Sequence, residues 1–205
     1  MKITRGLFDG MVLQRTRRDV CEAEFAGECG VGGRVLATVR KGRQALKGFS
    51  RIVVGRSVRG RLTGCLSGIP VGGPYAIDLE VAGDGQPPAR LGVKDVLVGD
   101  VWIVGGQSNA QGCGYVKDGP RAQRLVRAFY MDDRWRPAQD PIHNMWKTVD
   151  QVHIDLCGAV RPLKNMIIGT GPGVAFVQRL HQRTGIPQGV LACGHVGTSM
   201  AQWDP

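Results

Sequence analysis

The most constraining feature of this sequence is residues 96–104, which are apolar almost throughout and lead directly into Gly105-Gly106-Gln107-Ser108-Asn109. A continuous apolar run of this length is typical of a strand buried on both faces of a parallel sheet. Helices must cover both faces of such a sheet, so this part of the chain is restricted to the α/β class. Functional residues of α/β proteins gather at the carboxyl ends of strands, which is where the glycine-rich segment lies.

Two later segments support the same class. Residues 172–184 are expected to form a helix, because Pro172 suits a first helical turn and Gly185 suits the position just past the end. Apolar residues at threefold spacing give that helix one buried face. Residues 189–193 are expected to form another buried strand. Strand, helix and strand then alternate, as in a parallel α/β sheet.

The stretch between these elements is less regular. Residues 121–129 are expected to form a short helix that buries Leu125, Val126 and Phe129. Residues 130–165 contain several prolines and two tryptophans and show no clear period. We expect a long functional excursion there.

The first part of the chain shows a different pattern. Residues 35–39, 51–54 and 75–81 are short, partly alternating apolar runs separated by glycine-rich turns, and no helical period occurs before residue 95. This pattern predicts a small antiparallel β-sandwich. We therefore expect a β-sandwich-like domain over residues 1–95 and an α/β domain over residues 96–205.

Positive charge is concentrated in the first domain. The chain has a net charge of +10, and no acidic residue occurs between Glu28 and Asp78. The basic residues of that interval are Arg34, Arg40, Lys41, Arg43, Lys47, Arg51, Arg56, Arg59 and Arg61. They indicate either a polyanion-binding patch or solvated strand edges that discourage edge-to-edge pairing. Only Phe49 interrupts them as an aromatic residue, so nucleic acid is not an expected partner.

Several other classes of protein are disfavoured. No apolar run approaches the roughly 20 residues that span a bilayer. The six cysteines form no CxxC pair and no Cys/His spacing that fits zinc, so we expect free, buried thiols and no metal. The first five residues lack the apolar segment of a secretory signal peptide, and the compartment stays open.

Ser108 is the strongest candidate for chemistry. A serine hydroxyl becomes a nucleophile when a neighbouring base accepts its proton and nearby N–H groups hold the oxyanion. A sharp turn between a strand and a helix can supply both exposure and free N–H groups. The residues alone leave an alternative, since a serine at a helix start often serves as an N-cap.

Four ordered motifs extend this interpretation by resemblance. They are Gly10-Met11-Val12-Leu13-Gln14-Arg15, Gly72-Gly73-Pro74-Tyr75, Gly99-Asp100-Val101-Trp102 with Gly106-Gln107-Ser108-Asn109, and Gly169-Thr170-Gly171-Pro172-Gly173 with Gly197-Thr198-Ser199 to Trp203. Together they resemble the sialate O-acetylesterase branch of the SGNH hydrolases. The resemblance implies that the small antiparallel β domain is followed by an incomplete flavodoxin-like α/β/α three-layer domain.

The resemblance also assigns roles to individual residues. Ser108 would be the nucleophile and would donate its own N–H to the oxyanion, with Gly171 or else Gly173 giving a second N–H. Gly197 and Thr198 would form a third oxyanion element, although simple turn formation is the alternative for Thr198. Gln107, Asn109 and Trp203 would contact substrate, and ordinary packing is the alternative for Trp203. Val196 stands where the family usually has glycine and would crowd this turn.

The source of the general base is the main departure from the family. The family takes its acid-base histidine from an Asp-x-x-His-like segment downstream of the third block, and this chain ends at Pro205. Asp150 and His153 match that spelling but precede the second block, so we interpret them as a chance match. His195 could approach the site. We expect a C-terminal completing segment or chain to supply the base, so this chain alone would be inactive.

The resulting prediction is an esterase that removes O-acetyl groups from sugars by acyl transfer through Ser108, without a cofactor. An O-acetylated carbohydrate is the expected partner. One alternative is a carbohydrate-binding or interaction fragment that has lost catalysis. A second is a polyanion-binding protein that uses the basic residues 34–61.

Overall fold

The computed structural model describes residues 1–83, 85, 87–149, 151, 154–155, 168–202 and 204. It divides into two compact units, Met1–Asp100 and Val101–Pro205. Strands make up most of the regular structure, and the few helices lie in the second unit. The fold is therefore of the mixed α/β kind.

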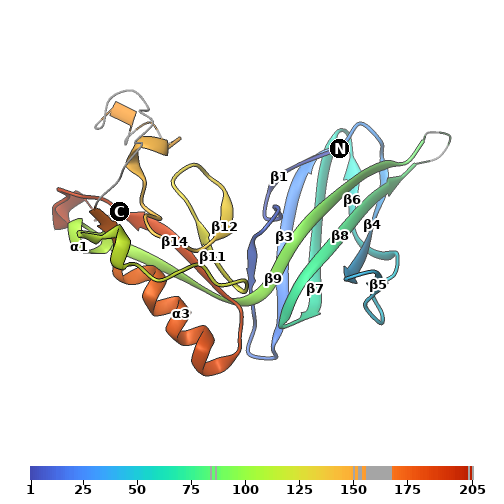
Figure 1. Cartoon of the computed structure of the whole chain (residues 1–205). Helices are drawn as coiled ribbons and strands as arrows, with labels where there is room; N and C mark the ends of the chain where they lie inside the picture. Colours follow the sequence, from blue (N-terminus) through green and yellow to red (C-terminus); the bar gives the residue numbers. More distant parts are fainter. Residues whose placement is uncertain are drawn as a thin grey trace. The chain divides into compact units, whose positions relative to one another are not determined.

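The first unit is built from strands. They are β1 (Lys2–Arg5), β2 (Val12–Gln14), β3 (Val20–Glu28), β4 (Gly33–Lys41), β5 (Gln44–Ala45), β6 (Ile52–Val58), β7 (Arg61–Pro70), β8 (Gly72–Ala82) and the first half of β9 (Ala89–Gly106). The strands, labelled in Figure 1, follow one hydrogen-bonded path, β1-β3-β7-β6-β4-β8-β9. Each pair along that path is antiparallel. The expected strands near residues 35, 52 and 75 lie in β4, β6 and β8.

One hydrophobic core fills this first unit. Tyr75, Ile77, Leu79 and Val81 alternate with more exposed residues along β8 and are all buried. They belong to the same cluster as buried side chains from β3, β4, β7 and β9. The close approach of β7 to this core needs a glycine at position 64, because a Cβ there would lie 2.3 Å from the ring of Phe25.

The second unit contains the remaining elements. Among the described residues these are the end of β9, α1 (Ser108–Gln111), β10 (Gly114–Tyr115), β11 (Val126–Phe129), β12 (Trp135–Pro137), β13 (Ile168–Thr170), α3 (Pro172–Thr184), β14 (Gln188–Gly194) and the 3₁₀ turns Val116–Asp118, Met145–Lys147 and Met200–Gln202. The strands are ordered β9-β14-β11-β12, with β11 parallel to β14 and antiparallel to β12. α3 packs on β14 and β11 (Figure 1).

The helix predicted over residues 172–184 is confirmed, and it begins at Pro172 and ends before Gly185 as expected. Pro172 occupies the first turn, and Gly185 closes the helix in the left-handed conformation while its N–H bonds to the His181 carbonyl. Val174 and Val177 are buried in a cluster with residues of β11 and β14. The strand predicted over residues 189–193 is also confirmed, as β14.

The short helix predicted over residues 121–129 is wrong. Val126–Phe129 forms strand β11 instead, because Val126, Arg127 and Ala128 are buried between β14 on one side and β12 on the other. These pairings join residues far apart in sequence, and they override the local pattern that favoured a helix.

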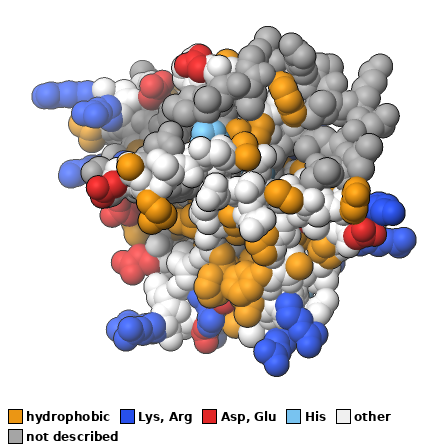
Figure 2. Space-filling view, turned by 90° about the vertical axis from the view of Figure 1, so that its left-hand side faces the viewer, with side chains coloured by type: hydrophobic (Ala, Val, Ile, Leu, Met, Phe, Trp, Pro, Cys, Tyr) orange, Lys and Arg blue, Asp and Glu red, His pale blue; other side chains and the backbone are white. Residues whose placement is uncertain are grey.

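The prediction that residues 96–104 are buried on both faces is correct only for the first half. Val96, Leu97 and Val98 are fully buried in the first unit, whereas Trp102 is 39% and Ile103 71% exposed. Trp102 packs edge-on against Phe176 of α3, with ring centroids 5.1 Å apart. Ile103 points to the opposite face, where the sheet is more open to solvent. The face of the second unit that Figure 2 shows carries several exposed hydrophobic side chains.

Candidate functional site

Ser108 begins a single helical turn immediately after strand β9. β9 ends at Gly106, whose φ of 134° lies in the region that favours glycine, and α1 runs from Ser108 to Gln111. Gln107 is the N-cap residue, and no side chain caps this turn. The N-cap interpretation of Ser108 is therefore wrong. Ser108 is half-buried, and its hydroxyl makes no hydrogen bond within the part of the chain that the structure describes.

The α1 turn rests on the backbone of two glycines that are distant in sequence. A Cβ on Gly194 would lie 2.8 Å from the Gln111 nitrogen, and one on Gly171 would lie 3.0 Å from the Ala110 oxygen. Gly112 likewise approaches Gly169, since a Cβ there would lie 2.5 Å from the Gly169 oxygen. Such contacts require residues without a side chain. The structure thus brings the Ser108 turn beside the start of α3 and the end of β14.

The turn after β14 is tied to the Ser108 segment by hydrogen bonds. The His195 N–H donates to the Gly106 carbonyl over 2.7 Å. The Val196 N–H donates to Oε1 of Gln111 over 2.9 Å. Gly197 adopts a φ of 76°, and the Thr198 hydroxyl donates to the His195 carbonyl over 2.8 Å. Val196 itself is 50% exposed.

The other predicted site residues lie in different surroundings. Gln107 and Asn109 are exposed on either side of Ser108. Gly171 is the N-cap of α3 and lies against α1, whereas Gly173 is buried under β9, where a Cβ would lie 2.9 Å from the Val104 side chain. Trp203, Asp150 and His153 lie outside the described residues.

His143 has a position that sequence reasoning missed. Its ring is buried, and Nε2 accepts a hydrogen bond of 2.9 Å from the Gly194 N–H. A neutral ring that accepts at Nε2 carries its proton on Nδ1. His143 therefore holds the end of β14 at the point where Gly194 contacts α1. No local pattern marks this role, because the two residues are 51 positions apart.

The other two described histidines serve different elements. Nδ1 of His181 is 2.8 Å from the Ile186 carbonyl, which anchors the chain just past the end of α3. His195 is half-buried, and its backbone N–H bonds to Gly106. The His181 ring is therefore engaged at the end of α3, and His195 is the described histidine that lies within the turn beside Ser108.

Asp140 is a second buried polar residue next to the site. Burial raises the pKa of its carboxyl to about 6, and the N–H groups of Ile142 and Gly171 offset that effect only in part. Neither carboxyl oxygen completes a hydrogen bond with a described residue, so the two N–H groups act on it as nearby dipoles. Asp140 consequently faces the amide of Gly171, one of the two glycines beneath the Ser108 turn.

The thiols differ in their surroundings. The described cysteines are all free, as expected, but only Cys21 and Cys29 are buried. Burial raises the pKa of the Cys21 thiol to about 11. Cys113 is exposed, and its thiol lies 3.2 Å from the Ser108 carbonyl oxygen. Alkylation of the Cys113 thiol can therefore report on the surroundings of the Ser108 turn.

No group of three or more His, Cys, Asp or Glu side chains among the described residues is arranged to hold a metal ion. No described helix has the length and apolar character needed to cross a membrane.

Comparison with protein families shows the family of this chain. The model of the carbohydrate esterase family described as sialic acid-specific acetylesterase matches residues 98–205, which is more than half of the chain. A comparison with curated proteins found no match. The matched region contains the Ser108 turn, the start of α3 at Gly171 and the turn after β14. These are the three segments that the structure brings together. The chain therefore belongs to the carbohydrate esterase family of sialic acid-specific acetylesterases.

Proposed function

We propose that this carbohydrate esterase removes acetyl groups from O-acetylated sugars, with Ser108 as the nucleophile. The observation that carries the proposal is the packing of the Ser108 turn on Gly171 and Gly194, at the carboxyl end of the β9 strand. Ser108 is partly exposed at the first position of its turn, where backbone N–H groups have no helical partner. An attacking hydroxyl needs such exposure and nearby N–H groups, and it also needs a neighbouring base.

The proposed reaction is acyl transfer in two steps. The Ser108 oxygen attacks the acetyl carbonyl carbon while a base takes the hydroxyl proton, and the carbonyl electrons move onto oxygen. Collapse breaks the bond between the acetyl carbon and the sugar oxygen, which receives the proton. Water then attacks the acetyl-enzyme, releasing acetate and restoring Ser108. No metal or organic cofactor takes part in the proposed reaction.

Backbone N–H groups are the proposed oxyanion donors. They belong to Ser108, Gly171 and the Gly197-Thr198 turn, and each fixed donor of this kind contributes about 3–4 kcal/mol to the transition state. The Gly171 N–H faces Asp140, so that carboxyl would share the donor with the oxyanion. Gln107 and Asn109, which are exposed beside Ser108, are the proposed contacts to the sugar together with Trp203.

The proposed base is a histidine on a C-terminal completing segment or chain, and His195, in the turn beside Ser108, is the alternative among the described residues. Two observations support this choice. The Ser108 hydroxyl has no hydrogen-bond partner among the described residues, and the rings of His143 and His181 are engaged at Gly194 and Ile186. A serine without its base loses most of its catalytic rate.

Labelling with a fluorophosphonate tests the nucleophile. Intact-mass measurement should show one label on the chain together with its completing segment or partner, and none on Ser108→Ala. Labelling of the chain alone that is lost in Ser108→Ala would keep Ser108 as the nucleophile and move the base to His195. Ser67→Ala is the matched control, because Ser67 is an exposed serine on β7 of the other unit. Labelling that survives Ser108→Ala would contradict the proposal.

The missing contact at the Ser108 hydroxyl also favours a second candidate, a carbohydrate-binding fragment without turnover. That function predicts equal affinity of the wild-type chain and Ser108→Ala for an O-acetylated sugar, with no acetate released. Acetate release that is lost in Ser108→Ala would exclude it.

A further inference from the structure

A basic hollow of about 760 Å³ lies on the sheet surface of the first unit. Four arginines line it, Arg5, Arg56, Arg59 and Arg61, and the only acidic residue among its lining residues is Glu28. All four arginines are exposed. We refer to this surface as the arginine hollow.

Strand register explains how these arginines come together. Arg5 of β1 pairs with Ala26 of β3, Ala26 with Thr63 of β7, and Thr63 with Arg56 of β6. Direct cross-strand partners point to the same face of a sheet. With neighbouring strands about 4.8 Å apart, Arg5 and Arg56 stand about 14 Å apart across a floor of small side chains.

The row continues onto the next strand. Arg56 pairs directly with Arg34 of β4, which places two positive side chains opposite each other. Like charges in that position destabilise a sheet. Within the part of the chain that the structure describes, none of Arg5, Arg34, Arg56, Arg59 and Arg61 forms an ion pair. Glu28 stands opposite Arg61 in the strand register, whereas Arg34 and Arg56 face each other without an acidic ion-pair partner among the described residues.

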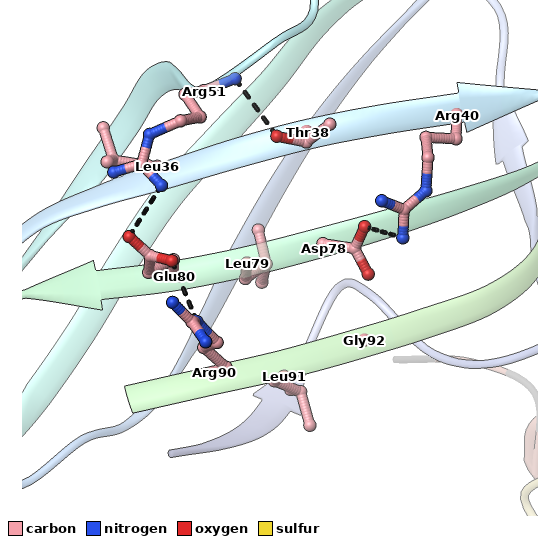
Figure 3. Close-up of a pocket in the computed structure, with 10 residues that line it drawn as sticks. All are labelled: Leu36, Thr38, Arg40, Arg51, Asp78, Leu79, Glu80, Arg90, Leu91 and Gly92. Carbon is pink, nitrogen blue, oxygen red and sulfur yellow. Dashed lines mark hydrogen bonds and ion pairs between the residues drawn. The ribbon is translucent and has the colours of Figure 1, made fainter. Parts of the chain in front are cut away.

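On another surface of the same unit, arginines form ion pairs with acidic residues. Arg40 pairs with Asp78, and Glu80 accepts from both Arg51 and Arg90 over 2.9 Å each (Figure 3). Every arginine drawn in that second hollow has an acidic partner. The arginines of this second surface, which we call the paired surface, are neutralised by carboxylates. Those of the arginine hollow form no ion pair with a described residue.

Edge protection does not account for the arginine hollow. Basic residues on an edge strand discourage pairing with another chain. β1 is an edge in the strand order, but β6 and β7 are interior strands with neighbours on both sides. Arg56 and Arg61 therefore do not lie on a free sheet edge that needs protection from pairing.

We propose that the arginine hollow binds a carboxylated polysaccharide. Exposed guanidinium groups bind carboxylates through paired hydrogen bonds, and a row about 14 Å long can contact successive acidic sugars. No aromatic residue lines the hollow, so it lacks the stacking platforms that single-stranded nucleic acids use. The family to which the chain belongs is specific for sialic acid, a sugar that carries a carboxylate.

The test uses the full chain and fluorescently labelled polysialic acid, with binding followed by anisotropy at low and at physiological salt. We expect binding that weakens with salt, no binding of neutral dextran, and weaker binding of single-stranded DNA of matched charge. Arg56→Ala/Arg61→Ala should raise the Kd about tenfold, because two charge-assisted contacts are lost. Far-ultraviolet circular dichroism and thermal unfolding confirm that each variant is folded.

Arg40→Ala/Arg90→Ala is the matched control, since it removes the same charge from the paired surface. We expect its Kd to stay within about twofold of wild type. Equal weakening by both double variants would overturn the proposal in favour of a net-charge effect. No binding of polysialic acid at low salt, or tighter binding of DNA, would also overturn it. Ser108→Ala should bind as wild type does, so this result is independent of the proposed esterase reaction.

Discussion

The ring of His143 and the backbone amide of Gly194 are joined by a buried hydrogen bond of 2.9 Å, although 51 residues separate them in the chain. Gly194 in turn contacts the backbone of Gln111 at the end of the α1 turn. Asp140 lies three residues before His143 and faces the amide of Gly171, which also contacts α1. Of these two buried polar residues, His143 therefore bonds to Gly194, and Asp140 faces Gly171.

Replacing His143 should destabilise the protein. His143→Ala leaves the Gly194 N–H without its acceptor and creates a cavity, at a cost of about 2–4 kcal/mol in the free energy of unfolding. His143→Gln keeps an acceptor and should cost less. Urea denaturation of the three proteins measures the difference. If the free energy of unfolding of His143→Ala lay within about 0.5 kcal/mol of wild type, the His143–Gly194 bond would not contribute to stability.

Asp140 should make stability fall as pH rises. Burial raises the pKa of its carboxyl from 3.8 to about 6, so the folded state holds the proton more tightly than the unfolded state. The penalty is absent below pH 4 and complete above about pH 6, where it amounts to about 3 kcal/mol.

Asp140→Asn should therefore gain stability relative to wild type as pH rises from 4 to 7. Urea unfolding at both pH values measures this gain. Asp133→Asn is the control, because Asp133 is exposed in the same segment. A constant difference between Asp140→Asn and wild type over this pH range would contradict the prediction.

Gly194→Ala should disturb the Ser108 turn. The added Cβ would lie 2.8 Å from the Gln111 nitrogen, a backbone atom that cannot move without shifting α1. We expect a loss of about 1–3 kcal/mol in stability together with reduced fluorophosphonate labelling of Ser108. Gly30→Ala is the control, because nothing lies within 4 Å of its Cβ position. Normal labelling of Gly194→Ala would mean that α1 tolerates the displacement.

Cys21 and Cys113 should differ in their rates of alkylation. Cys21 is buried with a thiol pKa of about 11, so roughly one thiol in a thousand is ionised at pH 8. Cys113 is exposed and should react with iodoacetamide far faster. Peptide mapping after timed alkylation measures both rates in one sample. Equal alkylation of Cys21 and Cys113 in the folded protein would contradict the burial of Cys21.

Local signals in the sequence were sufficient for several elements. The ends of α3 follow from Pro172 and Gly185, which act through their own backbone preferences. β8 and β4 follow from alternating apolar residues, because a period of two gives a strand one buried face. The Ser108 segment was recognised from contiguous residues in ordered motifs, and the family match over residues 98–205 agrees with that recognition.

The tertiary structure decided what depends on distant partners. Residues 126–129 became a strand because β14 and β12 flank them. Asp140 and His143 gained their places beside Gly171 and Gly194 through contacts that no sequence window contains. The arginine hollow likewise depends on the register that aligns four strands. The sequence by itself determined the elements whose causes are local, such as caps, turns and periodicity, whereas folding alone determined which residues meet across the chain.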